Sequence, residues 1–484
     1  MKFKTILLTL LACHALMAQE QLGLRLENYA GVSSISLNPT GNLTNPLPWD
    51  LNLAGAGIFF DNNYAFVQQT STFDLLKRAQ NASFLLAGDV EGPVPVDTYV
   101  VDFYDPGRKH FASAIAYVEG PSLVVKIGER HSVGVFTRAG AMTGSHDFPQ
   151  VFSYYTYTQR SLFEPFEVVP FEGAAISWME TGLNYALKIP TYSGQLGLGA
   201  NVRFLQAYEG AYMENMLSFD YTKLANNSIS FSSKHGRFGY THSNVSGDKF
   251  KRQKNGHGMA FDLGAVLVLE GDGENYKMRL GASLLDIGFL RFDKNARQHR
   301  VSFDSLVVLN LSDYDQFDKL KELDAFVGQF SRQTMGDSLA TLQGGAFTIA
   351  MPAAASLQAD YALTPNVYVN ATLVQRLPTK NTSPGRNNLL ALTPRFEHRW
   401  FSASVPLVLL NWQDLRFGFA ARLGWIVVGS DNVGSLFGQK KDYSGTDLYF
   451  ALKVNPFDLH LSLFGGGSRK RHFGKRGRVK CYDF

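Results

Sequence analysis

Three short runs in the chain hold side chains that hydrolytic enzymes use. The first places Ser145, His146 and Asp147 next to one another. A catalytic triad needs these groups to converge from separated positions, whereas neighbours on a strand point to opposite faces. Residues 430–432 (Ser-Asp-Asn) and 246–249 (Ser-Gly-Asp-Lys) match two β-lactamase elements, but their spacing is wrong and no Lys-Thr-Gly follows. We therefore expect that the protein is not an enzyme.

Side chains that could hold a metal ion or a cofactor are scattered. The 11 histidines include no pair at H-x-x-x-H spacing, and the two cysteines are Cys13 and Cys481. The sequence contains no G-x-x-x-x-G-K-[ST] phosphate loop. The sequence thus predicts no catalytic residue, no metal and no cofactor.

Isolated charges within alternating apolar segments are the remaining side chains of interest. They are Glu180, Arg203, Asp262, Lys277 and Arg279. If these segments are strands, alternation places the charges on the face opposite the apolar one. Charges inside a membrane barrel usually pair to fill the lumen, and less often they mark a substrate path. We predict that all five residues face a lumen.

The segment 259–284 shows the alternation most clearly. Apolar residues alternate with small or charged ones before and after the turn Gly271–Asn275. A period of two indicates strands, and each half matches the roughly 9–11 residues that cross a membrane. Tyr276 falls on the face predicted to meet lipid, and Lys277 and Arg279 fall on the polar one. A one-residue slip would put Lys277 into lipid at a cost of roughly 2–4 kcal/mol, which specifies the register.

The same pattern recurs along the chain. Comparable hairpins cover residues 122–138, 179–204 and 355–375. Further predicted strands are 390–399, 402–410, 415–428 and 448–454. Long strands and short turns predict an antiparallel meander that closes into one transmembrane β-barrel. We expect about 14 strands, from the even series that such barrels form.

The composition agrees with an all-β membrane protein. The chain has 484 residues, of which 45 are Gly and 13% are aromatic, and 18% are charged against roughly 25% in soluble domains. The mean hydropathy is -0.10, and no run of 18 apolar residues follows the N-terminal region, so no transmembrane helix is expected. The net charge of +4 is small and does not argue for a nucleic-acid partner.

The N-terminus has the features of an export signal. Residues 1–18 combine a basic start, an apolar run and a small residue before the expected cut after Ala18. Leu11, two residues before Cys13, is bulkier than a lipidation signal usually has there, which disfavours lipidation of Cys13 but leaves it open. Removal of residues 1–18 leaves one cysteine and therefore no intrachain disulfide. We expect the exported protein to lie in the outer membrane.

Three segments depart from the strand pattern. Residues 19–50 are turn-rich and are predicted to form a lead-in to the barrel or a plug within it. Residues 212–254 are polar and are predicted to form a long loop. Residues 313–332 have apolar side chains at helical spacing, which predicts a short helix in an extracellular loop. That helix either caps the barrel mouth, which we favour, or binds a partner.

The end of the chain is strongly basic. The predicted barrel, residues 51–467, is followed by a tail, residues 468–484, rich in Lys and Arg. Such a run cannot lie in lipid. We interpret it as a solvated periplasmic tail, and the alternative is contact with an acidic partner or lipid headgroups. The final Phe484, with Tyr482 two residues earlier, is similar to the assembly signal of outer-membrane barrels.

Several segments of the sequence resemble known families of outer-membrane barrels. Residues 28–39, which end in Asn38 and Pro39, resemble the lead-in of long-chain fatty-acid-transporter-like barrels. Residues 256–264 and 285–289 look like the central signature of a Bacteroidota family of outer-membrane β-barrels of unassigned function. Residues 394–397, 405–407 and 424–432 fit the same family. The resemblance implies an outer-membrane barrel without an agreed substrate.

Two functions are therefore expected. One is a transporter or channel for hydrophobic or small molecules, with residues 19–50 as a plug. The other is a structural or assembly barrel that presents its loops or tail to a periplasmic or cell-surface protein partner. A wide or laterally open lumen with an apolar pocket would favour transport. A lumen packed shut by Glu180, Arg203, Asp262 and Arg279 would favour the second function. Outer-membrane lipid and a hydrophobic small-molecule ligand are further expected partners, whereas nucleic acid is not.

Overall fold

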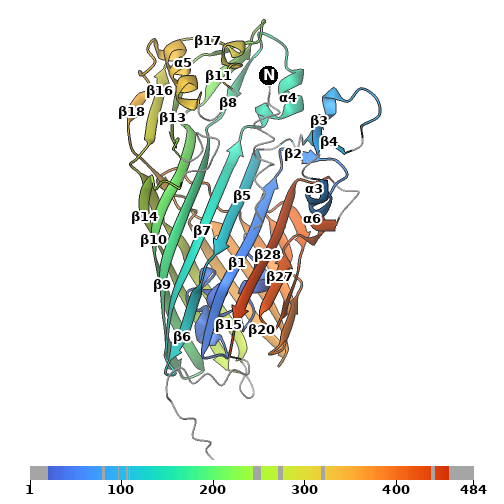
Figure 1. Cartoon of the computed structure of the whole chain (residues 1–484), viewed down its shortest axis with the longest axis vertical. Helices are drawn as coiled ribbons and strands as arrows, with labels where there is room; N and C mark the ends of the chain where they lie inside the picture. The colour runs from blue at the N-terminus through green and yellow to red at the C-terminus, as the bar shows by residue number, and fades with distance from the viewer. Residues whose placement is uncertain are drawn as a thin grey trace, which may run out of the picture.

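Fourteen antiparallel strand positions close into a barrel, because the first strand pairs with the last (Figure 1). Strand β1 (Trp49–Asn62) lies between β28 (Gly445–Val454) on one side and β5 (His110–Glu119) on the other. The predicted all-β transmembrane barrel and its strand number are thus confirmed. This computed structural model describes residues 20–456 except 79–81, 96, 105–106, 108, 244–251, 271–275, 318–321 and 438–441.

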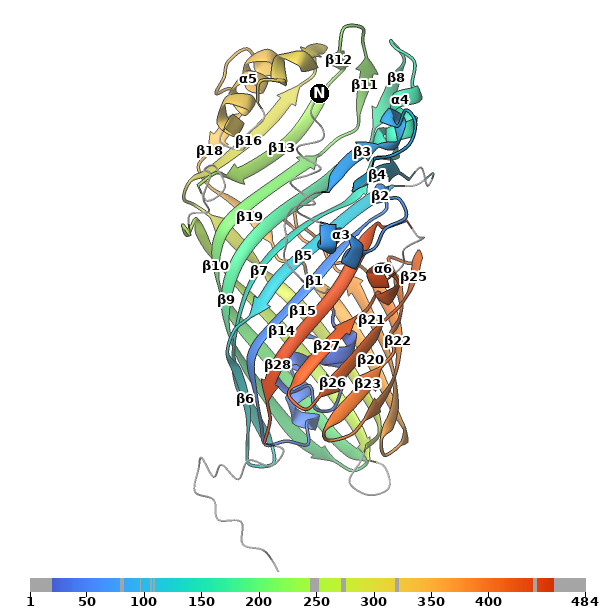
Figure 2. The same cartoon turned by 45° about the vertical axis from the view of Figure 1, so that its right-hand side comes forward.

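Each position of the barrel wall holds one strand or two strands in line (Figures 1 and 2). After β1, in order around the barrel, they are β5 with β6 (Ser122–Ile127), β7 (His131–Phe148), β9 (Phe171–Thr191), β10 (Gly194–Asn215), β14 (Gly256–Glu270), β15 (Tyr276–Phe292), β19 (Phe347–Ala350) with β20 (Ala354–Thr364), β21 (Val367–Arg376), β22 (Leu389–Glu397), β23 (Phe401–Ser404) with β24 (Leu407–Leu410), β25 (Asp414–Phe417) with β26 (Phe419–Leu423), β27 (Ile426–Ser430) and β28. Two of the in-line pairs meet at Pro121 and Pro406, since proline has no N–H for the ladder.

The outer face of the wall is apolar and has aromatic residues at its edges. Large apolar side chains such as Leu183 and Leu263 point outward and are exposed. Exposed Trp400 and Trp425 lie in short turns at one end of the strands, and Trp412 lies at the other end. Aromatic belts of this kind mark the two edges of the membrane, and short turns mark the periplasmic side.

On one side of the barrel the sheet forks above the wall. The upper end of β10 leaves β14 after the Ala207–Gly256 pair and continues against β13 (Lys234–Thr241), starting with the pair Ala211–Tyr240. Strands β16 (Ala296–Phe303) and β18 (Leu342–Gly344) then extend this branch. Through this branch of β10, β13, β16 and β18, the sheet extends above the barrel into the long extracellular connections (Figure 2).

Two small sheets and several short helices complete these connections. An outer lobe has an aromatic core and contains β8 (Pro165–Val168), β11 (Phe219–Lys223), β12 (Ser228–Phe231), β17 (Val307–Asn310), η4 (Gln150–Phe152), α4 (Tyr154–Gln159), η5 (Leu311–Tyr314) and α5 (Leu323–Met335). A side lobe contains β2 (Ala65–Val67), α3 (Thr72–Arg78), β3 (Ser83–Leu86), η3 (Ala87–Asp89) and β4 (Thr98–Phe103), and α6 (Val433–Phe437) lies beside α3. None of the described helices is long and apolar enough to cross a membrane.

Three predicted elements differ from those observed. Residues 415–428 form a hairpin rather than one strand, because Gly424 adopts a positive φ of 57° in the turn between β26 and β27. The predicted helix 313–332 begins later, as α5, and ends at Gly336, which has a φ of 85°. The predicted loop 212–254 contains β11, β12 and β13. Several predicted parts lie outside the described residues: the signal peptide, the tail, both cysteines, residues 246–249 and the turn 271–275.

Candidate functional site

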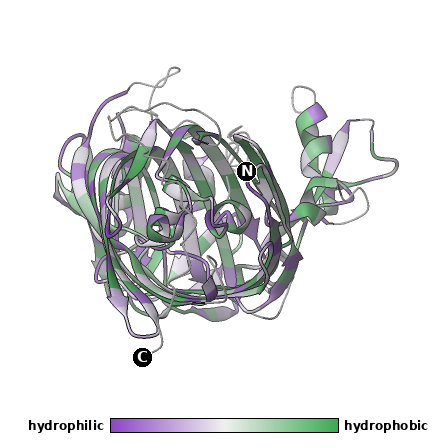
Figure 3. Cartoon of the chain, turned by 90° about the horizontal axis from the view of Figure 1, so that it is seen from below, coloured by the Kyte–Doolittle hydropathy of each residue, from purple (hydrophilic) through white to green (hydrophobic). Residues whose placement is uncertain are grey.

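The chain before the first barrel strand lies inside the barrel. We call residues 20–48 the inner segment. It contains α2 (Leu22–Arg25), η1 (Gly31–Ser36) and η2 (Gly41–Thr44), and most of its side chains are buried. Figure 3, which looks in from the short-turn end, shows these helices within the ring of strands. The inner segment therefore fills the periplasmic half of the lumen.

Apolar side chains form one part of the contact between the inner segment and the wall. Leu22, Leu26 and Leu37 pack in one cluster with wall residues that include Leu285 and Val374. Leu24 packs in a second cluster, with Ala420, Val427, Tyr449 and Ala451. At about 1.5–3 kcal/mol for each large side chain that is removed from water, these four leucines stabilise the docked segment.

Buried ion pairs form the other part of that contact. The Arg422 guanidinium lies 3.0 Å from the Glu27 carboxylate, and both side chains are buried. Within the wall, the Lys453 ammonium of β28 lies 3.2 Å from Asp50 of β1, and Asp50 accepts a hydrogen bond from the backbone N–H of Val32 in the inner segment. Each partner would be an unpaired buried charge if the other were removed. The inner segment is thus held by charge as well as by apolar contact.

Asn38 and Pro39, the predicted lead-in motif, lie against glycines of the wall, Gly264 and Gly199, where no side chain covers the backbone. The Asn38 amide donates to the carbonyl oxygen of Ala265 at 3.2 Å and to the Gln358 side chain at 3.0 Å. A Cβ on Gly264 would lie 2.3 Å from the Asn38 side chain. The absence of a side chain at Gly264 allows the close approach of Asn38.

Three of the predicted lumen residues meet in one buried cluster. The Arg203 guanidinium lies 2.9 Å from Asp262, 3.4 Å from Glu180 and 2.6 Å from Asp286. Arg386, from the connection between β21 and β22, pairs with Asp286 at 3.3 Å and with Glu20 of the inner segment at 2.9 Å. A continuous chain of ion pairs therefore joins the wall to the start of the inner segment.

Arg279 belongs to a second cluster near the periplasmic end. It pairs with Asp360 at 2.9 Å and donates to the Thr44 hydroxyl at 2.8 Å. Asp360 also pairs with Arg395 at 2.6 Å, and Arg395 pairs with Glu397. Both clusters are buried, so that charges facing the lumen hold the wall and the inner segment together.

Lys277 is a correction to the prediction, because it lies on the outer face. Its ammonium group lies 4.6 Å from the centre of the ring of Tyr361, which points outward. Glu270 pairs with Tyr276 while Leu269 pairs with Met278, so Lys277 is the extra residue of a β-bulge. Tyr276 turns inward instead and donates to Asp360 at 2.5 Å. Lys277 lies beside a periplasmic turn, where a cation on the lipid face costs only about 0–1 kcal/mol.

The sequence-based prediction missed several lumen charges, among them Asp286, Asp360 and Arg386. Asp262 opposes both Leu285 and Asp286 in a second bulge, and Asp286 adopts a positive φ of 55°. Strict alternation cannot place a residue within a bulge. Asp360 fits the alternating pattern of β20 and could have been found by it, whereas Arg386 lies outside any strand.

The two hydrolase-like runs that the structure describes, 145–147 and 430–432, form no catalytic relay. The Ser145 hydroxyl donates to the Glu172 carbonyl oxygen at 3.0 Å, and Asp147 lies 3.5 Å from Lys109. Asp431 accepts a hydrogen bond from the backbone N–H of Leu22 at 3.0 Å, so the 430–432 run contacts the inner segment. Among the described residues no group of three or more His, Cys, Asp or Glu side chains could hold a metal ion.

A model of a family of unknown function (DUF5723) matches residues 102–431, which is more than half of the chain. The chain belongs to this family. The match covers the wall from β5 to β27, and with it the Arg203 cluster and Arg386. A comparison with curated proteins finds no match.

Solved structures similar to this member of the DUF5723 family are outer-membrane barrels. A deltaS2S3 mutant of the monoaromatic hydrocarbon channel TodX is 9% identical, with 88% of this chain and 95% of that chain covered and a TM-score of 0.41. The Ralstonia pickettii toluene transporter TbuX is 8% identical, with 88% and 94% covered and a TM-score of 0.31. A Pseudomonas aeruginosa FadL homologue is 11% identical, with 87% and 92% covered and a TM-score of 0.22. The sequence identities and TM-scores are too low to support a functional argument.

Above the inner segment the inner face of the wall becomes apolar. One buried cluster contains Trp178, Leu205, Leu290, Ile349 and Met351, with further small and aromatic residues from these and neighbouring strands. The indole N–H of Trp178 donates to Glu180 at 3.0 Å, which joins this cluster to the Arg203 ion pairs. The barrel interior thus has an apolar extracellular half and a charged periplasmic half.

Proposed function

We propose that this protein is a gated transporter for hydrophobic or small molecules, and that the inner segment is its gate. The observation that carries the proposal is the closure of a 14-strand barrel by about 30 residues of its own chain. Side chains alone fill barrels of about 8 strands, whereas wider barrels enclose a channel or need a plug. A barrel of this width, closed by a separate segment, can open when that segment moves.

The contact between gate and wall supports such a movement. Glu20 and Glu27 of the inner segment are paired with Arg386 and Arg422, and water can solvate all of these groups once the lumen fills. A small pocket of about 50 Å³ lies between the inner segment and the wall, and it is lined mainly by polar residues such as Thr40 and Gln358. A few waters fit in such a space, since each needs about 10–15 Å³.

The apolar extracellular half of the lumen supports the class of cargo. Buried Trp178, Leu290 and Ile349 lie on three different strands, β9, β15 and β19. An apolar inner face favours the entry of apolar molecules and disfavours ions, because an ion would lose its hydration there. We therefore propose small apolar molecules ahead of salts and sugars as the cargo.

Conductance and solute flux with and without the inner segment test this proposal. We expect the full-length protein to be silent in planar bilayers and a deletion of residues 20–47 to conduct. The deleted variant must first show the β-sheet circular dichroism and the heat-modifiable gel mobility of a folded barrel. A folded deletion variant that neither conducts nor passes small solutes into liposomes would contradict a gate.

The second candidate function is a structural barrel that presents its extracellular lobes to a cell-surface protein partner. The packed lumen favours it, because Glu180, Arg203, Asp262 and Arg279 are all buried and paired in the closed state. The same deletion distinguishes the two functions. A structural barrel without its inner segment would lose stability but would give no cargo-selective flux.

A further inference from the structure

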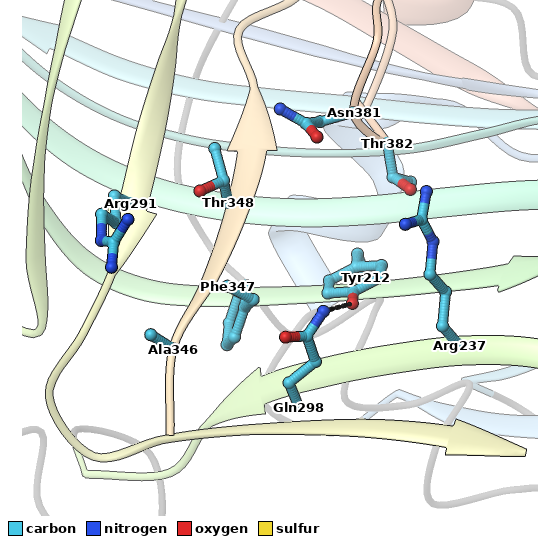
Figure 4. A pocket seen from close by; sticks show the side chains of 9 residues that line it. All are labelled: Tyr212, Arg237, Arg291, Gln298, Ala346, Phe347, Thr348, Asn381 and Thr382. Carbon is cyan, nitrogen blue, oxygen red and sulfur yellow. Dashed lines mark hydrogen bonds between the residues drawn. The ribbon is translucent and has the colours of Figure 1, made fainter. Parts of the chain in front are cut away.

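A pocket of about 240 Å³ opens in the fork of the sheet, above the barrel wall (Figure 4). We call it the fork pocket. Strands β10, β13, β15, β16 and β19 contribute to it, and the connection between β21 and β22 supplies Asn381 and Thr382. All lining residues except Ala346 and Phe347 carry polar side chains. The fork pocket is separate from the inner segment and from both charge clusters.

Part of the polar lining is fixed by hydrogen bonds. The Arg237 Nε donates to Glu214 at 2.6 Å, and the Thr382 hydroxyl donates to the same carboxylate oxygen at 3.2 Å. The Gln298 amide donates to the Tyr212 hydroxyl at 3.0 Å, as Figure 4 shows. These bonds hold the side chains in place before any ligand arrives, which lowers the entropy cost of binding.

Other lining groups are left without partners. Among the described residues, the side chains of Arg291, Thr348 and Asn381 make no hydrogen bond or ion pair, nor do the terminal nitrogens of Arg237. Figure 4 shows Arg291 and Arg237 on opposite sides of the fork pocket, with Thr348 between them. The fork pocket therefore offers several open donors to one ligand.

The charge of the lining points to a ligand with one negative charge. Glu214 neutralises Arg237 through their ion pair at 2.6 Å. Arg291 is then left as the one uncompensated charge among the described lining residues. A guanidinium prefers a carboxylate, with which it forms charge-assisted hydrogen bonds of about twice the ordinary strength.

The size and the polar lining of the fork pocket point to a small polar ligand. Phe347 lines part of the fork pocket, and its buried ring packs against Phe292, with centroids 5.0 Å apart, and against Tyr212, at 5.5 Å. The volume is below the roughly 300–1,000 Å³ of sites for drug-sized ligands. A long alkyl chain would meet mostly polar groups here, whereas a small molecule with several hydroxyl groups would bond to the open donors.

We propose that the fork pocket binds a small, hydroxyl-rich monoanion of the size and chemistry of a hexuronic acid. The carboxylate pairs with Arg291, and the hydroxyls accept hydrogen bonds from Asn381, Thr348 and Arg237. This site goes beyond the proposed gate and does not depend on it, because no residue of the inner segment lines the fork pocket.

Calorimetry on the purified full-length protein in detergent tests the site. The probes are D-glucuronate, D-glucose as its neutral counterpart, and octanoate as an apolar monoanion. We expect saturable binding of glucuronate to one site, with glucose and octanoate each at least about ten-fold weaker. Arg291→Ala should weaken glucuronate binding at least about ten-fold, and Asn381→Ala should weaken it by a smaller factor.

Arg332→Ala is the matched control, because it removes an exposed positive charge on α5, away from the fork pocket. All variants must retain the gel mobility of the folded barrel. Equal binding of glucose and glucuronate, preferred binding of octanoate, unchanged affinity in Arg291→Ala, or no binding of glucuronate would each overturn the proposal. None of these results bears on the gate, which is tested by the deletion of residues 20–47.

Discussion

Arg203 is the residue on which the buried charges of the wall depend most. It pairs with Asp262, Asp286 and Glu180, and its side chain is almost fully buried. Arg203→Ala would leave three carboxylates without their shared cation. We predict a loss of about 3–5 kcal/mol in the free energy of unfolding, measured by urea titration in lipid vesicles.

Lys277→Ala is the control for the Arg203→Ala prediction. Alternation in the sequence predicts that both Arg203 and Lys277 face the lumen, but in the structure Lys277 lies on the outer face of the barrel. Its removal should change the free energy of unfolding by no more than about 0.5 kcal/mol. Equal losses in the two variants would contradict the placement of Arg203 in a buried cluster.

Alternation predicted four of the five lumen charges in their observed positions and failed at the two bulges. Glu180, Arg203 and Arg279 lie in regular stretches of strand, where a period of two is reliable. Lys277 and Asp286 lie in bulges, whose positions depend on pairing with a partner strand. The sequence of β15 alone carries no clear signal for the extra residue that each bulge inserts.

His299 should make the extracellular branch sensitive to acid. Its ring is buried, stacks on Phe238 with centroids 4.8 Å apart and bonds to Thr341. Burial, with a smaller effect of Arg297, lowers the pKa of His299 from 6.5 to about 4. The neutral ring is therefore the folded form, so its contribution to stability is present above pH 6.5 and is lost as the pH falls towards 4.

Hydrogen exchange at pH 7.5, 5.5 and 4 measures this effect in β13 and β16. Protection of these strands should decrease at acid pH in the wild type and much less in His299→Gln, in which the residue cannot be protonated. His257→Gln, at an exposed histidine, serves as the control and should behave like the wild type. Protection that does not change with pH would show that His299 does not control this branch.

At the scale of elements, α2 of the inner segment is held very close to the wall. A Cβ on Gly23 would lie 2.2 Å from the Cβ of Ala420 and 2.5 Å from the Tyr449 hydroxyl. We predict that Gly23→Val displaces α2 from β26 and β28. Limited proteolysis within residues 20–48 should become at least about ten-fold faster, as expected for a contact weakened by more than 1.4 kcal/mol.

Gly344→Val provides the comparison, because a Cβ at Gly344 meets no atom within 4 Å. That variant should be cleaved at the wild-type rate. If Gly23→Val were as resistant as the wild type, the close contact of α2 with the wall would be wrong.

The strands of the barrel were predictable because each has a long alternating pattern. The hairpin at 355–375 was predicted to within one residue at each end of the pair β20 and β21. The hairpin at 179–204 was placed at β9 and β10, but β9 begins at Phe171 and β10 ends at Asn215, so both strands extend beyond it. The turn at Gly424 was missed, since apolar residues on both sides hide a two-residue connection within an apparently continuous run. The path of the inner segment depends on contacts with many strands, and local sequence does not encode those.

At the scale of the whole molecule, the barrel encloses two different environments. The periplasmic half holds the inner segment and its ion pairs, and the extracellular half is lined by apolar side chains. The fork of the sheet adds a polar pocket above both. The proposed gated transporter requires such a division, with entry from outside and a periplasmic side that stays closed until the inner segment moves.

The central claim is that the inner segment gates the barrel, and a reversible lock tests it most directly. Asn42 and Ser132 join η2 to β7 through a hydrogen bond of 2.7 Å between their side chains. Asn42→Cys and Ser132→Cys, in a Cys481→Ser background, would link the segment to the wall. We predict that proteoliposomes take up small apolar molecules when the pair is reduced and stop when it is oxidised. Equal uptake in the two states, with the disulfide shown to be formed, would contradict the gate.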